Sequence, residues 1–80
     1  MSEVTVRFFA SARAAAGKSN QSFSPDSVAH ILELCASGNQ SLARVLPQCS
    51  VLIDGLICHD HKQFVLAGSE LDILPKFAGG

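Results

Sequence analysis

Leu71-Asp72-Ile73-Leu74-Pro75-Lys76-Phe77-Ala78-Gly79-Gly80 is the stretch that organises the chain, because it predicts a strand followed by a tail. Residues 71–74 have strand character, and the proline that follows lacks a backbone N–H, so it marks a strand end or an edge. Gly79 and Gly80 have no side chain to collide with a narrow passage. We therefore expect a flexible tail over about residues 75–80, whose terminal carboxylate can be offered to another protein. The alternative is an ordinary disordered end with small residues.

The size and composition of the chain limit what it can be. Eighty residues predict one domain over residues 1–80, near the lower size limit for an unaided core. A net charge of −1 without a basic stripe argues against nucleic acid as a partner. The apolar runs are too short to span a membrane.

The expected location of the protein follows from its start and its cysteines. Residues 1–6 lack the basic and apolar regions of a secretory signal. The three cysteines, an odd number without CxxC spacing, are typical of reduced thiols. We therefore expect a cytoplasmic protein.

The first part of the chain predicts two strands joined by a short helix. Residues 4–9 alternate apolar and polar side chains with β-branched and aromatic content, which indicates a strand. The alanine-rich residues 11–16 favour a helix, and Gly17 stands where a helix C′ glycine is expected. Residues 21–23 are a weak strand candidate that could pair with the first strand.

One amphipathic helix follows. Asp26 or Ser27 is the expected N-cap. The apolar residues then recur at helical spacing, which places four of them on one stripe: Val28, Ile31, Leu32 and Cys35. Cys35 is interpreted as a core residue, and His30 is expected in solvent because it lies off the stripe. Residues 42–46 repeat the helical spacing for about one turn before a proline.

The second half predicts a hairpin and a final strand. Residues 51–53 are a buried type of strand, Asp54-Gly55 is a two-residue turn signal, and residues 56–58 form the partner strand. Residues 64–66 are interpreted as a short apolar anchor. The resulting fold class is α+β, a mixed β-sheet with one main amphipathic helix packed on one face. We expect the first and last strands to pair at the centre of this sheet.

Alternation along the strands predicts a partner surface at the base of the tail. If Val4, Val6 and Phe8 face the helix, Phe9 points to the opposite side. Leu74 would also point outward, and Leu52 would join if its neighbours face inward. With Phe77, these side chains would form an exposed apolar patch of the kind that marks an interaction site. The alternative is that some of them complete the core.

Both ends of the chain resemble a known family. Phe8-Phe9-Ala10, Arg13 and Gly17 are similar to its opening motif, and residues 66–80 are similar to its closing motif of a turn, a strand, proline and a terminal Gly-Gly. The family is the MoaD/ThiS group of sulfur carriers, which have a ubiquitin-like β-grasp fold, and the chain looks most like the MoaD branch. It departs from the pattern at Ser69, Lys76 and Phe77.

The resemblance implies a sulfur carrier that is not an enzyme on its own. Gly80 would be adenylated and then converted to a thiocarboxylate, which donates sulfur to cyclic pyranopterin monophosphate in molybdopterin synthase, a step of molybdenum cofactor biosynthesis. Gly79 would allow the tail to thread the partner's channel. The implied partner contacts are Phe9, Leu74, Pro75, Lys76, Phe77 and Ala78.

The implied partners are two proteins. One is the MoaE-like large synthase subunit, with which the chain would form a heterotetramer. The other is an E1-like, MoeB-like activating enzyme that uses ATP. No permanently bound cofactor is expected. Three alternatives stay open: a ThiS-like carrier for thiamine thiazole synthesis, a ubiquitin-like modifier that forms isopeptide bonds through Gly80, and a binding module whose tail does nothing.

Two other features have structural interpretations. Cys58-His59-Asp60-His61 contains metal-capable side chains, but a structural zinc site needs a second ligand pair at suitable spacing, so we expect a solvated loop with Cys58 half buried and no metal. Arg13 is expected on the surface, and its place in the opening motif gives it a possible docking role.

Overall fold

The computed structural model describes residues 3–76. Its elements follow the chain in this order: β1 (Val4–Phe8), α1 (Ala10–Ala16), β2 (Asn20–Phe23), β3 (Asp26–Ser27), α2 (Val28–Ala36), α3 (Gln40–Val45), the 3-10 helix η1 (Leu46–Gln48), β4 (Cys49–Ile53), β5 (Leu56–Ile57), β6 (Phe64–Val65) and β7 (Glu70–Pro75). No helix among these residues has the length and apolar character needed to cross a membrane.

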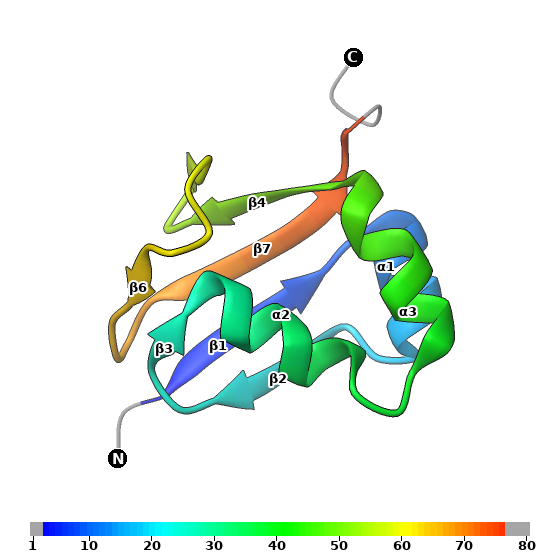
Figure 1. Cartoon of the computed structure of the whole chain (residues 1–80), viewed down its shortest axis with the longest axis horizontal. Coiled ribbons are helices and arrows are strands. Elements are labelled where there is room, and N and C mark those ends of the chain that lie inside the picture. Colours follow the sequence, from blue (N-terminus) through cyan, green and yellow to red (C-terminus); the bar gives the residue numbers. More distant parts are fainter. Residues whose placement is uncertain (1–2, 77–80) are drawn as a thin grey trace.

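The main sheet is mixed and has the order β2-β1-β7-β4-β5 (Figure 1). The first and last strands pair in parallel at its centre, with Val6 opposite Leu71 and Phe8 opposite Ile73. The other pairs, β1–β2, β4–β7 and β4–β5, are antiparallel. This confirms the predicted central pairing, and it places β7, which leads to the tail, between two partner strands.

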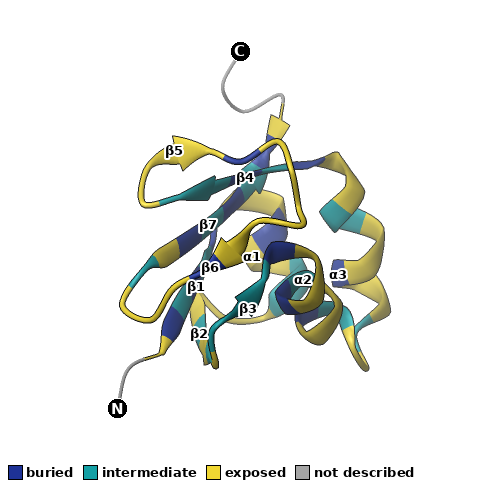
Figure 2. Cartoon of the chain, turned by 60° about the vertical axis from the view of Figure 1, so that its left-hand side comes forward, coloured by how far each residue is buried: buried dark blue, intermediate teal, exposed yellow. Residues whose placement is uncertain are grey.

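The helices cover one face of this sheet, as Figure 1 shows. The inner side chains of β1 and β7 are completely or almost completely buried, as strand alternation requires. Helix α2 contributes Val28, Ile31 and Cys35 to the core, while Leu32 packs at its margin. The predicted two-layer β-grasp arrangement is therefore confirmed. Figure 2 shows the buried residues where the sheet and the helices meet.

Local sequence signals set the ends of the helices. Ser27 is the N-cap of α2, and its hydroxyl oxygen accepts the N–H of His30 at 3.2 Å. Gly17 ends α1 with φ of 75°, and its N–H donates to the carbonyl of Arg13 at 3.0 Å. Asn39 caps α3 and also donates its side-chain amide to the carbonyl of Ala15 at 3.0 Å, which joins α3 to α1.

The Asp54-Gly55 hairpin turn is confirmed. Both residues have positive φ, 49° and 84°, as a two-residue turn of this kind requires. The Asp54 carboxylate accepts the backbone N–H of Glu70 at 2.9 Å, so the turn is also tied to the start of β7.

A second, two-stranded sheet pairs β3 with β6 and was not predicted. Its position corrects the predicted apolar anchor over residues 64–66. Only Val65 is buried, whereas Phe64 and Leu66 are 55% and 67% exposed. The reason is that residues on either side of a buried strand residue point the opposite way.

Candidate functional site

The candidate site begins at the end of β7. Pro75 is the last residue of this strand and lies opposite Cys49 of β4. The Pro75 side chain is buried in the free chain, and the partner contact predicted for it stays a prediction. Lys76 is exposed. The predicted site residues Phe77, Ala78, Gly79 and Gly80 lie outside the described residues.

The sheet face opposite the helices, here called the outer face, carries the other predicted contacts. Phe9 is 40% exposed, and Leu74 and Leu52 are partly exposed. Leu52 lies opposite Ile57, which is 57% exposed, so the apolar surface continues to the edge of the sheet. Neither Phe9 nor Leu74 is fully buried in the core, whereas Phe77, the third side chain of the predicted patch, lies outside the described residues. Ile57 is an addition that the sequence alone did not predict.

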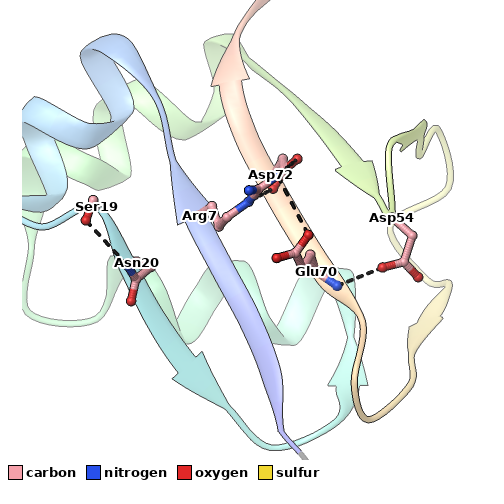
Figure 3. Close-up of polar contacts among 6 residues, drawn as sticks. All are labelled: Arg7, Ser19, Asn20, Asp54, Glu70 and Asp72. Atoms are coloured by element: carbon pink, nitrogen blue, oxygen red, sulfur yellow. Dashed lines mark hydrogen bonds and ion pairs between the residues drawn. The ribbon is translucent and has the colours of Figure 1, made fainter.

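A bidentate ion pair fixes the polar centre of the outer face. Arg7 of β1 donates two hydrogen bonds to the carboxylate of Asp72 of β7, at 2.7 and 2.9 Å (Figure 3). The Glu70 carboxylate lies 3.8 Å from the same guanidinium. The hydrogen bond and the charge of Asp72 raise the pKa of Arg7 above its ordinary value. Opposite charges on adjacent central strands are the signal that could have predicted this pair.

The ion pair also positions the predicted contact Phe9. The guanidinium carbon of Arg7 lies 5.5 Å from the centre of the Phe9 ring, within the range of a cation–π contact. Because Asp72 holds the guanidinium in place, the ring has a fixed neighbour on the outer face. An aromatic anchor that is oriented before binding loses less conformational entropy when a partner covers it.

The cysteines have environments of buried structural thiols. Cys35 is buried, as predicted, and burial raises its pKa to about 11. Cys58 is 6% exposed rather than half buried, and its Sγ donates to the carbonyl of Asp60 at 3.3 Å. Burial also raises the pKa of Cys58 and Cys49. A thiol with a raised pKa is a poor nucleophile, which is typical of structural cysteines.

The polar segment after Cys58 and the exposed Arg13 complete the predicted features. His59 and His61 are both exposed. Within residues 3–76, no three His, Cys, Asp or Glu side chains lie close enough together to hold a metal ion. Arg13 is exposed, and the docking role predicted for its side chain stays a prediction.

Several solved structures share this fold. A Pyrococcus furiosus protein provisionally named molybdopterin converting factor subunit 1 has a TM-score of 0.81 at 14% identity, over 94% of this chain and 98% of that one. Small archaeal modifier protein 1 from Methanosarcina acetivorans has a TM-score of 0.80 at 26% identity, over 100% and 98%. A complex of subunits 1 and 2 of the molybdopterin-converting factor from Helicobacter pylori contains a chain with a TM-score of 0.73 at 18% identity, over 98% and 99%.

These likenesses establish the ubiquitin-like β-grasp fold. A search of curated proteins found no match. The model of the ThiS family matches residues 6–80, which is nearly the whole sequence, and the chain therefore belongs to the ThiS family.

Proposed function

We propose that this chain is the sulfur-donating small subunit of a molybdopterin synthase and that Gly80 carries the sulfur as a C-terminal thiocarboxylate. The observation that supports this most is the family match, which extends through the terminal Gly79-Gly80 of a family of small ubiquitin-like sulfur carriers. The geometry agrees, because β7 is held between β1 and β4 and ends at Pro75, one residue after the partly exposed Leu74.

The chemistry needs an activated carboxyl group. A carboxylate is a poor acyl donor because its leaving group would be oxide. An E1-like, MoeB-like partner would use ATP to form an acyl-adenylate at Gly80, with release of pyrophosphate. Hydrosulfide as the nucleophile would then attack the carbonyl carbon and displace AMP, which leaves the thiocarboxylate and releases a proton. In this scheme the chain carries the reacting atom, and the partners supply nucleotide binding and proton transfer.

Docking to the large, MoaE-like subunit would use the outer face. Four side chains offer exposed or partly exposed apolar area on this face: Phe9, Leu74, Leu52 and Ile57. The Helicobacter pylori structure is a complex of two such subunits, which supports a partnership of this kind. A heterotetramer with two copies of each subunit would place each tail in one active site, where the sulfur passes to cyclic pyranopterin monophosphate. The described cysteines are free thiols, which suits action in the reducing cytoplasm.

Intact-mass analysis tests this proposal. The purified chain is incubated with ATP, a MoeB-like enzyme and a sulfur donor, and the loaded chain is then mixed with a MoaE-like subunit and cyclic pyranopterin monophosphate. We expect a mass gain equal to one oxygen replaced by sulfur, which is lost again as molybdopterin forms. Loading without molybdopterin formation would exclude the synthase role, and loss of sulfur to a thiazole synthase would indicate the thiamine branch.

A ubiquitin-like modifier is the second candidate. It is favoured by the 26% identity to small archaeal modifier protein 1 across the whole chain. In that case the activated Gly80 would form isopeptide bonds with lysines of other proteins. High-mass conjugates that disappear when Gly79 and Gly80 are deleted would support the modifier over the sulfur carrier, and full biological activity of the deleted chain would exclude both.

A further inference from the structure

A cavity of about 310 Å³ opens beside the end of β7. It forms because β5 has only two residues, so within residues 3–76 the Cys49–Ser50 part of β4 has no strand partner on the β5 side. Polar side chains make up a large part of its lining: Ser50, His59, His61 and Lys76. Apolar side chains form the other walls: Leu46, Pro47, Val51 and Ile57. A concave site with a few polar groups set among apolar walls is the usual form of a ligand site.

The polar side chains of the lining are hydrogen-bond donors. They supply an ammonium, a hydroxyl and two imidazoles, each of which keeps an N–H in either protonation state. The two thiols of the lining already donate elsewhere. Cys49 Sγ donates to the carbonyl of Val45 at 3.3 Å, and Cys58 Sγ donates to that of Asp60 at 3.3 Å. Among the residues that the structure describes, no carboxylate lines the cavity, so it presents donors and positive charge without a negative group.

Asp60 stands between the two histidines in the sequence, but it does not line the cavity. One oxygen of its carboxylate accepts the backbone N–H of Lys62 at 2.9 Å. Burial and then the charge of Asp60 raise the pKa of Cys58. At Cys49 burial again raises the pKa, but the ammonium of Lys76 opposes this effect. The positive end of the cavity is therefore the end at Lys76.

The segment that carries His59 and His61 is held in place before any ligand binds. The carbonyl of His61 accepts the N–H of Ala29, in the first turn of α2, at 2.8 Å. The Cys58 N–H donates to the carbonyl of Val51, also at 2.8 Å. These bonds tie the segment to the helix on one side and to β4 on the other. Donors that are held in a fixed arrangement lose less conformational entropy when they bind a ligand.

We propose that this cavity binds a carboxylate on a short apolar stem, with the carboxylate at Lys76 and the stem against the apolar walls. A hydrogen bond between an ammonium and a carboxylate is charge-assisted, and the imidazoles and the Ser50 hydroxyl offer further donors. The apolar walls contribute only to a ligand that has apolar surface of its own, so they favour such a carboxylate over a bare inorganic anion.

Two sources share this chemistry: an acidic side chain of a partner protein and a free small dicarboxylate. Both present a carboxylate on methylene groups, so the cavity recognises either in the same way. That the acidic side chain belongs to the large synthase subunit rests on the proposed function.

NMR titration of the native chain measures the binding without any partner protein. The probes are glutarate, its neutral analogue glutaramide and inorganic phosphate, at constant pH and ionic strength. We expect saturable shifts of the His59 and His61 ring signals with glutarate, none with glutaramide, and weaker binding of phosphate. Lys76→Gln should weaken glutarate binding by about fivefold, which corresponds to about 1 kcal/mol.

Lys62→Gln is the matched control, because it removes the same charge from an exposed residue of the neighbouring loop that does not line the cavity. It should leave the affinity for glutarate unchanged, and Lys76→Arg should retain most of it. Three results would each overturn the proposal. They are equal shifts with glutarate and glutaramide, phosphate that binds as tightly as glutarate, and equal affinities of Lys76→Gln and Lys62→Gln.

Capture of the large synthase subunit by Lys76→Gln distinguishes the two sources. Weaker capture together with weaker glutarate binding identifies an acidic side chain of the partner, whereas unchanged capture with weaker glutarate binding identifies a free dicarboxylate. The titration does not depend on sulfur loading, so the two proposals fail separately. A chain that binds glutarate but never gains sulfur contradicts the carrier function alone, and a chain that gains sulfur but does not bind glutarate contradicts the ligand of the cavity alone.

Discussion

Replacing Ile73 by alanine removes a fully buried side chain from the central strand of the sheet. Ile73 lies on β7, opposite Phe8 on one side and Val51 on the other, and its exposed fraction is 0%. Deleting three carbons loses about 2.4 kcal/mol of transfer free energy, and the cavity left behind adds about 1 kcal/mol. We therefore expect a loss of about 3–4 kcal/mol from a domain whose whole stability is about 4–12 kcal/mol.

Ile57→Ala is the matched control, since it deletes the same atoms from the outer face. Ile57 is 57% exposed, so its loss should cost less than about 1 kcal/mol. Urea unfolding followed by far-UV circular dichroism measures both. With a slope of about 1 kcal/mol per M for a small domain, the midpoint of Ile73→Ala should fall by about 3 M and that of Ile57→Ala by less than 1 M.

The two substitutions also separate stability from binding. Ile57→Ala should weaken capture of the large synthase subunit while leaving the fold intact, because the outer face is the proposed docking surface. Equal losses of stability in the two variants would refute the assignment of inner and outer faces. Unchanged partner affinity in Ile57→Ala would remove the β5 edge from the interface.

Three further predictions concern the hairpin turn, a charged pair and the tail. Asp54→Ala should lower the free energy of unfolding by about 1–2 kcal/mol, because it removes a residue suited to the left-handed turn and the 2.9 Å hydrogen bond to the N–H of Glu70. Asp54→Asn should keep most of the wild-type stability. Equal urea midpoints for these two variants would contradict the prediction. The hydrogen bond between His30 and Asp26 raises the pKa of His30 and lowers that of Asp26. Their mutual stabilisation should therefore be greatest between pH 3.8 and 6.5, the ordinary values, and should fade as pH rises through the raised pKa of His30 or falls through the lowered pKa of Asp26. The stabilisation is measured as the difference between the urea midpoints of the wild type and His30→Gln across this pH range. A difference that does not change with pH would contradict a stabilising His30–Asp26 pair. Gly80→Ala, or one residue appended after it, should abolish sulfur loading in the intact-mass assay with an unchanged unfolding midpoint, and normal loading would refute the need for a bare glycine terminus.

The periodic elements of this fold could be predicted from the sequence, and the short ones could not. Alternation in residues 4–9 and the helical stripe from Val28 to Cys35 each repeat often enough to identify a strand and a helix. Strands β3 and β6 have two residues each and show no period, so only their tertiary partners define them. The same lack of a period explains why the apolar anchor predicted over residues 64–66 is wrong for Phe64 and Leu66, whose side chains are exposed.

The residues of the outer face could be predicted where the alternation of side chains along a strand was applied. Phe9 and Leu74 point outward as expected. Carrying the same alternation one residue further along β7 would have placed Pro75 inward, where the structure has it. Ile57 was not predicted as part of the outer face, because the face on which its side chain lies depends on its pairing with Leu52. A strand of two residues is too short for its sequence to specify that register.

The position of β7 has a consequence for biosynthesis. Until residues 70–75 have left the ribosome, the sheet lacks its central strand β7, which pairs with both β1 and β4. The domain therefore closes only after nearly all of it has been translated, when distant segments first meet. The proposed docking surface on the outer face would thus exist only on molecules whose sheet is already complete.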